Sequence, residues 1–298
     1  MTVFISFLPI KKFPIFFIIA FFAIQLTASD RLFFVKDRIK ERLISSSLHP
    51  KSLQTVSSHS IEDSSKAISI TELINSGDDK FEAMEYPSAI SIYEKALSIE
   101  PTNPEILWRL ARVFVCTGDV TEEKDREVYY IKATEYARQS VTQQNISSKC
   151  YTWLSAALGN LAMYRGSRDK VKFSVEIKQY VEKAIQLNPN DDVAYSILGS
   201  FHRALGNVSW LERQLANVFL GGLPEGGYIE AENAYNKAIK ISPSGLRHHF
   251  ELGLLYLDWG KDQEAYSVFL KASQLKPQML SDIDRLNRIK EYLKSLKP

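Results

Sequence analysis

The stretch Gly253–Pro277, GLLYLDWGKDQEAYSVFLKASQLKP, decides the fold of this chain, because its small and aromatic residues recur in another segment at the same spacing. That segment is Gly77–Pro101, GDDKFEAMEYPSAISIYEKALSIEP. Glycine, alanine, an aromatic residue, alanine and proline occupy the same positions in both: Gly253, Ala265, Phe269, Ala272 and Pro277, and Gly77, Ala89, Tyr93, Ala96 and Pro101. Recurrence at a fixed spacing predicts that one small structural unit is used several times along the chain.

Partial copies of the same pattern lie between the two complete ones. Pro243 and Pro277 are 34 residues apart, which gives the length of one unit. Three segments keep the second half of the pattern, two of them with the proline and one without it: Ile177, Val181, Ala184 and Pro189; Ala231, Tyr235, Ala238 and Pro243; and Ala133, Ala137 and Ser140. Complete and partial copies together predict about five units.

The physical chemistry of these positions indicates that each unit is a pair of helices. Small residues let a partner helix approach closely, and an aromatic side chain one turn away fills the space beside them. A proline ends the second helix because it cannot continue the hydrogen-bond ladder. Each hairpin leaves apolar surface that only neighbouring hairpins can cover. The sequence therefore predicts an all-α solenoid of about five helical hairpins within residues 68–298, and it resembles the tetratricopeptide repeat from about Ile70 to Pro277.

The fourth unit is longer than the others between its two helices. Gly199 and Ala231 are 32 residues apart, whereas the corresponding glycine and alanine are 12 residues apart in the two complete copies. Within the extra segment, apolar residues follow a helical spacing: Trp210, Leu211, Leu215 and Phe219. We expect an inserted amphipathic helix that packs on the solenoid, covers its groove or touches lipid. A further helix after Pro277 would cap the last hairpin.

Composition narrows the range of partners. The chain of 298 residues has 37 Lys and Arg against 35 Asp and Glu, a formal charge of +2. Such a balance gives no general attraction to nucleic acid, so an electrostatic partner must meet a local patch of charge. The two cysteines, Cys116 and Cys150, lack the spacing of a disulfide framework or a metal site. We expect both to be buried thiols.

The sequence contains no motif typical of an enzyme. Its glycines do not form a phosphate-binding loop after a strand, and no nucleophile stands beside a base in a recognisable context. The five histidines have no cysteine or carboxylate pattern typical of a metal site. His248 and His249 are adjacent, so they point to different sides of a helix. We therefore expect a non-enzymatic protein that uses no cofactor and no metal.

The first thirty residues indicate an interaction with lipid. Lys11 and Lys12 precede an apolar run, and Phe13–Ala28 would rise about 24 Å as a helix, which suits a short membrane anchor or a cleaved secretory signal. The cations that follow favour a retained anchor with the rest of the chain in the cytosol: Arg31, Lys36, Arg38, Lys40 and Arg42. Cleavage would instead give a secreted or lumenal protein. Residues 31–67, basic and then rich in serine, are predicted to be a linker.

Three segments carry a narrower resemblance. The segments are LWRLAR at Leu107–Arg112, KAIQLNP at Lys183–Pro189 and WLERQLA at Trp210–Ala216. Together they resemble the regulator of microtubule dynamics family over roughly Ile68–Leu296. The resemblance implies a helical scaffold associated with microtubules, with mitochondria or with another organelle membrane such as the endoplasmic reticulum, some members being held by an N-terminal membrane segment. It implies no defined binding motif.

Two surfaces are predicted to bind partners. The first helices of the hairpins should line a concave groove for proteins, with these contact residues: Trp108, Arg112, Val115, Ser200, Arg203, Leu254 and Leu257. Ile74 and Asp78 stand where a carboxylate-binding array would begin, which disfavours capture of peptide C-termini. A basic patch on the terminal helix could meet acidic tubulin: Arg285, Arg288, Lys290 and Lys294. The alternative function is a membrane-contact tether or a lipid-binding scaffold.

Overall fold

A computed structural model of the chain describes residues 69–209, 213–214 and 222–296. The chain divides into two units, Met1–Ser65 and Lys66–Pro298, and all the described residues belong to the second. Some predictions therefore lie outside the described residues: the N-terminal membrane segment (1–30), the linker (31–67) and the inserted-helix residues Trp210, Leu211, Leu215 and Phe219. Among the helices that are described, none is both long enough and apolar enough to cross a membrane.

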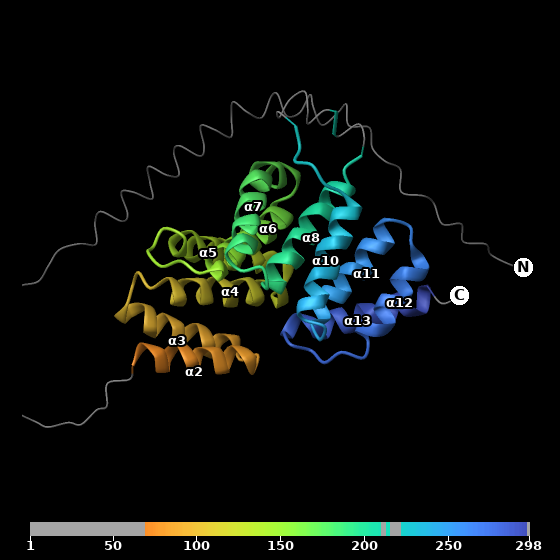
Figure 1. The fold of residues 1–298 in the computed structure, drawn as a ribbon. Helices are drawn as coiled ribbons and strands as arrows, with labels where there is room; N and C mark the ends of the chain where they lie inside the picture. The colour runs from red at the N-terminus through yellow and green to blue at the C-terminus, as the bar shows by residue number, and fades with distance from the viewer. Residues whose placement is uncertain (1–68, 210–212, 215–221, 297–298) are drawn as a thin grey trace, which may run out of the picture. The chain divides into compact units, whose positions relative to one another are not determined.

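The described residues form eleven α-helices and no strand, which confirms the all-α prediction (Figure 1). The helices are α2 (Ile70–Glu82), α3 (Tyr86–Ile99), α4 (Pro104–Val120), α5 (Arg126–Ser140), α6 (Ser148–Arg165), α7 (Ser167–Leu187), α8 (Asp192–Gly206), α10 (Tyr228–Ile241), α11 (Leu246–Asp258), α12 (Asp262–Ala272) and α13 (Leu280–Ser295). They pair as five antiparallel hairpins, α2/α3, α4/α5, α6/α7, α8/α10 and α11/α12. The predicted solenoid is confirmed.

Local sequence signals set where the helices begin. At the start of α2, the Ser69 hydroxyl accepts from the Glu72 N–H and the Glu72 carboxylate accepts from the Ser69 N–H, so two otherwise unpaired donors are satisfied. Asn103 caps α4 through the Glu105 N–H. Asp191 caps α8 through the Ala194 N–H.

In three hairpins a proline closely follows the end of the second helix, as the pattern predicts. Pro101 follows the end of α3, Pro189 follows the end of α7, and Pro243 follows the end of α10, each by two residues. Since proline cannot donate to the ladder, the chain turns at these points toward the next hairpin. In the fifth, α12 ends at Ala272, five residues before Pro277.

The repeated small residues form the contact between helices. The alanines of the pattern are fully buried in every hairpin that has them: Ala89, Ala96, Ala133, Ala137, Ala184, Ala231, Ala238, Ala265 and Ala272. The apolar core is divided into two clusters, one running through α2–α8 and one through α10–α13. Cys116 and Cys150 are free and buried, as predicted.

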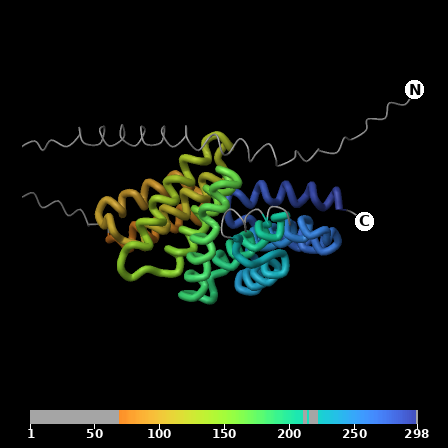
Figure 2. The backbone as a smooth tube through the Cα atoms, turned by 90° about the horizontal axis from the view of Figure 1, so that it is seen from above, coloured from red at the N-terminus to blue at the C-terminus, as the bar shows by residue number. Residues whose placement is uncertain are grey.

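The terminal helix α13 packs on α11 and α12 and therefore caps the last hairpin. It also contacts α4, which belongs to the second hairpin. Figure 2 shows α13 as the dark blue helix whose N-terminal end lies toward the earlier repeats. The end of the solenoid is thus joined to its beginning.

Candidate functional site

The predicted groove residues lie in the layer made by the first helices of the hairpins, α2, α4, α6, α8 and α11. We call these helices the first-helix layer. Within it, α4 contacts α6, α6 contacts α8, and α8 contacts α11. Three of the four junctions between successive first helices carry an ion pair in the described residues. These junctions show what the predicted binding residues do in the folded chain.

The junction of α2 with α4 is centred on the carboxylate of Asp78. It accepts from the Tyr93 hydroxyl at 2.7 Å, from Arg109 Nε at 2.8 Å and from Arg112 Nη2 at 2.6 Å. Burial raises the pKa of Asp78, but the Tyr93 hydrogen bond and the two guanidinium groups outweigh it and hold that pKa below its usual range. The Arg112 guanidinium also lies 3.8 Å above the Phe81 ring. Arg112 is therefore used to join two hairpins.

The other two groove residues predicted on α4 are parts of the core. Trp108 is 6% exposed, and its Nε1 donates to Glu105 Oε2 at 2.9 Å. Arg109 lies over its ring at 4.2 Å. Val115 is 2% exposed and belongs to the first apolar cluster. Neither side chain offers much surface to a ligand in this conformation.

Two adjacent aspartates at the N-terminus of α8 form contacts with the hairpins on either side. Asp191, fully buried, accepts from Lys149 Nζ at 3.1 Å and from the Thr152 hydroxyl at 2.8 Å, which joins α8 to α6. Asp192 lies 3.0 Å from Nε2 of His248 on α11. Burial raises the pKa of Asp192, but the contact with His248 outweighs it, so that pKa lies below its usual value. The N-terminus of α8 therefore links three successive hairpins.

Arg203 strengthens the junction between α8 and α11. Its Nε donates to Asp258 at 2.6 Å and its Nη1 to Glu251 at 3.1 Å. Ser200, one turn earlier, accepts from the Tyr235 hydroxyl at 3.0 Å. Leu254 and Leu257 are half-buried and pack against the second apolar cluster. The predicted groove residues are thus brought to one layer, where Arg112 and Arg203 join successive hairpins. The other five pack or hydrogen-bond within their own hairpins or in the apolar core.

The four cations of the predicted basic patch on α13 differ in their exposure and in their partners. Arg285 pairs with Asp282 of its own helix at 2.8 Å and is 13% exposed. Arg288 is exposed, and its guanidinium lies 4.9 Å from the centroid of the Phe250 ring. Lys290 and Lys294 are exposed, and no ion pair within the described residues involves them. Three of the four cations are therefore exposed and outside any ion pair among the described residues, and of these Lys290 and Lys294 also lie over no aromatic ring.

Sequence reasoning missed a convergence of α4, α11 and α13. Asp119 of α4 accepts from the Tyr130 hydroxyl at 3.0 Å, and Arg247 of α11 and Arg285 of α13 act on it electrostatically. Burial nevertheless raises the pKa of Asp119. No local pattern could have found this cluster, because its members come from three elements that only the closed solenoid brings together.

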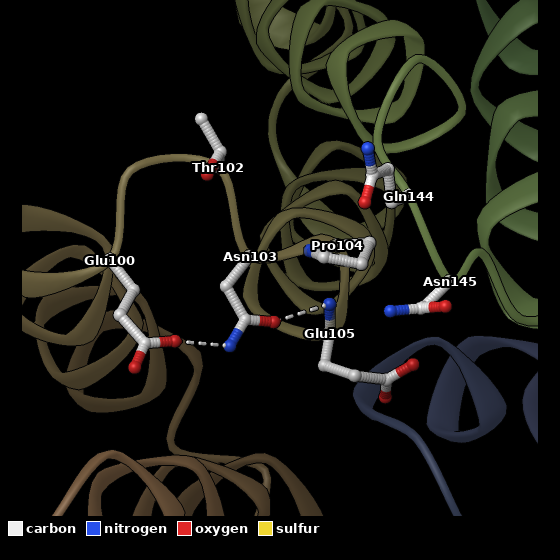
Figure 3. A pocket seen from close by; sticks show the side chains of 7 residues that line it. All are labelled: Glu100, Thr102, Asn103, Pro104, Glu105, Gln144 and Asn145. Atoms are coloured by element: carbon white, nitrogen blue, oxygen red, sulfur yellow. Dashed lines mark hydrogen bonds between the residues drawn. The ribbon is translucent and has the colours of Figure 1, made fainter.

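An open polar hollow of about 430 Å³ lies at the turns that precede α4 and α6. Figure 3 shows the side chains that line it: Glu100, Thr102, Asn103, Pro104, Glu105, Gln144 and Asn145. The Asn103 side chain donates to the Glu100 carboxylate and accepts from the Glu105 N–H. Of its lining side chains, Asn103 caps the N-terminus of α4. Within the described residues, no group of three or more His, Cys, Asp or Glu side chains could hold a metal ion.

The similarity of this chain to known proteins covers the same five hairpins. The family model described as Regulator of microtubule dynamics protein 1-3 matches residues 73–297, which is more than half of the chain. The chain belongs to the regulator of microtubule dynamics family. The family match begins within α2 and runs past the end of α13, so it includes all five hairpins and the terminal helix.

Curated members of the regulator of microtubule dynamics family are distant relatives. Mouse Regulator of microtubule dynamics protein 1 is 28% identical over 176 residues, 58% of this chain and 58% of that protein. Rat Regulator of microtubule dynamics protein 2 is 24% identical over 195 residues, 65% of this chain and 47% of that protein. The chain therefore spans about half the length of the curated relatives it matches.

A solved structure supports the fold. A thermophilic TPR (tetratricopeptide-repeat) protein from Thermus thermophilus superposes with a TM-score of 0.57 at 22% identity, covering 76% of this chain and 100% of that one. At this identity the similarity shows the fold alone. The regulator of microtubule dynamics domain of this chain is thus a tetratricopeptide-like solenoid, as the sequence pattern predicts.

Proposed function

We propose that this protein is a non-enzymatic scaffold that binds protein partners, including microtubules, while its N-terminal segment holds it at an organelle membrane. The family membership of residues 73–297 carries this proposal. The curated relatives are named as regulators of microtubule dynamics, and the matched region is a helical-repeat fold, an architecture suited to presenting extended binding surfaces. The membrane attachment rests on the apolar run at Phe13–Ala28.

The contact with microtubules is proposed to be electrostatic. The chain is almost neutral, so an acidic polymer must be met by cations that are not already paired. Lys290 and Lys294 satisfy this condition, because both are exposed on α13 and separated by one helical turn. Arg285 contributes less, since Asp282 neutralises it.

Co-sedimentation of the full chain with microtubules tests this proposal. Lys290→Glu combined with Lys294→Glu should reduce the pelleted fraction several-fold, and the unaltered chain should pellet less as salt rises, because screening weakens exposed charges. The matched control carries the same charge change at Lys95 and Lys240, which are exposed on α3 and α10. Pelleting that ignores both salt and the α13 substitutions would refute the electrostatic contact.

Membrane attachment needs a separate experiment. Carbonate extraction of cell membranes should leave the full chain in the membrane pellet, and protease added to intact organelles should degrade the repeat domain. A shortened, protease-protected and extractable product would instead indicate cleavage of the N-terminal segment.

A further inference from the structure

The junction of α6 with α7 is strongly basic for a chain that is almost neutral. Residues 164–173, YRGSRDKVKF, contain four Lys and Arg and one acidic residue, a local charge of +3 that exceeds the +2 of the whole chain. The helix α13 contains four Lys and Arg and three acidic residues, a charge of +1. The junction of α6 with α7 is therefore the more cationic of the two surfaces.

Three cations of this segment have no ionic partner. Arg168, Lys170 and Lys172 are exposed near the start of α7, and no ion pair among the described residues involves them. We call these three residues the α7 basic patch. The Lys172 ammonium lies 5.2 Å from the centroid of the Phe173 ring, which leaves its charge uncompensated by any carboxylate.

The acidic residues beside the α7 basic patch are bound to other arginines. Arg165 pairs with Glu127 of α5 at 2.6 Å and with Asp169 of α7 at 3.5 Å. Arg138 of α5 pairs with Glu176 of α7 at 2.8 Å. Each of these carboxylates thus has an arginine partner outside the patch, so the charge of the patch is available to an external anion.

The helix α5 adds a fourth cation to this surface. The ion pairs Glu127–Arg165 and Arg138–Glu176 each join residues 38 positions apart, so α5 runs alongside the start of α7. The helix α6 contacts both of them (Figure 1). The same separation places Lys132 level with Lys170 of the patch. Lys132 is exposed and takes part in no ion pair among the described residues.

The exposed face of α7 suits an acidic protein better than a membrane surface. Arg168, Lys172 and Val175 are four and three residues apart, so they lie on one face of the helix. Val175 is 55% exposed, but α7, all of whose residues are described, has no exposed aromatic side chain. Helices that lie in a membrane interface bury a face of large apolar residues. The attraction offered by α7 is therefore mainly one of charge.

We propose that the α7 basic patch, together with Lys132, is a second contact with the acidic surface of a microtubule, separate from the contact at Lys290 and Lys294. This inference rests on the microtubule-binding part of the proposed function and adds the more cationic of its two surfaces. Two contacts on one domain strengthen each other, because the first holds the second at a high effective concentration.

Co-sedimentation of the full chain over a range of microtubule concentrations tests the proposal. Arg168→Glu combined with Lys172→Glu should weaken binding about tenfold, because attraction becomes repulsion at two exposed positions. Arg168→Lys combined with Lys172→Arg keeps both charges and should bind as the unaltered chain does. The matched control reverses two charges elsewhere, at Lys95 of α3 and at Lys183 of α7, both exposed, and should also leave binding unchanged.

The charge-reversed variant should fold, because Arg168 lies in the first turn of α7, where a carboxylate is favourable to the helix dipole. Circular dichroism checks this. If that variant does not fold, Arg168→Gln combined with Lys172→Gln removes the charges without reversing them and should weaken binding about threefold. The proposal is overturned if a folded variant of the patch pellets as well as the control does.

Two further outcomes are distinguished in the same experiment. Absence of pelleting by the unaltered chain would refute microtubule binding itself, which is a different result from loss of the patch contact. The variants are also incubated with phosphatidylcholine vesicles, with and without phosphatidylserine. Substitutions in the patch that reduce binding to the phosphatidylserine vesicles and leave pelleting with microtubules unchanged would assign the patch to a lipid surface and overturn the proposal.

Discussion

The ring of Phe269 fills the space in which a β-carbon on Gly253 would lie. A β-carbon built at Gly253 would be 2.3 Å from Cε1 of Phe269, far inside van der Waals contact. Gly77 and Tyr93 have the same relationship at 2.3 Å, and Gly199 and Tyr235 at 2.7 Å. The glycine and the aromatic residue of the repeat are therefore two halves of one contact between the helices of a hairpin.

This contact predicts the effect of adding a single methyl group. Gly77→Ala and Gly253→Ala should each lower the free energy of unfolding by about 1–3 kcal/mol, because a fixed aromatic ring would have to move. Urea denaturation measures the change. Gly159→Ala is the control: it lies inside α6 with no atom within 4 Å of the added carbon. That substitution should stabilise the helix by about 0.5–1 kcal/mol, and equal losses at all three positions would contradict the explanation.

Asp78 should support the first junction of the solenoid. Asp78→Asn leaves Arg109 and Arg112 without their shared charge, and we expect a loss of about 1–3 kcal/mol in unfolding free energy. Because the folded pKa of Asp78 is lowered, its contribution is complete above the ordinary value for aspartate and disappears as pH falls through the folded pKa. The difference between the two proteins should therefore shrink in acid.

The control for Asp78 is an exposed ion pair. Glu122 and Lys124 are 76% and 74% exposed, so Glu122→Gln should change stability by less than about 0.5 kcal/mol. A loss at Glu122 as large as the loss at Asp78 would show that the junction has no special role.

The two cysteines should be unreactive in the folded protein. Burial raises the pKa of Cys116 to about 12 and also raises that of Cys150, so almost no thiolate is present at neutral pH. A disulfide reagent such as Ellman's reagent should label neither thiol in the native state and both after unfolding. Fast labelling of Cys116 under native conditions would indicate that α4 is exposed.

Two histidines should make the fold sensitive to mild acid. Burial lowers the pKa of His202 and of His249, so the unfolded chain takes up protons more readily than the folded one. Their contribution to stability is complete above the ordinary histidine pKa of about 6.5 and is lost as pH falls below it. Unfolding free energy should therefore decrease between about pH 7.5 and 5.5, and His202→Gln should decrease less steeply. An unchanged slope in His202→Gln would exclude His202 as a cause.

The pattern of small and aromatic residues made the hairpins predictable. The ion-pair partners of the charged residues could not be predicted in the same way. Ala89 and Tyr93 have their roles within one hairpin, where spacing along a helix decides which residues meet. Arg112 and Arg203 are predicted from the repeat pattern to line the groove. The structure adds that both join neighbouring hairpins, because their partners, Asp78 and Glu251, lie on other helices. A local pattern carries no information on partners so far away in sequence.

The sequence by itself determined that this protein is built of repeated helical hairpins and belongs with a family of known helical proteins, because those properties depend on residues close together in the chain. Only the tertiary structure decided that the last helix returns to the opening hairpins, where the Leu280 N–H donates to the Tyr86 hydroxyl and Arg285 acts electrostatically on Asp119. This return depends on small rotations between hairpins that add up over the whole domain. The sequence of a single repeat does not determine the total rotation, so the contact between the two ends can be seen only in the folded chain.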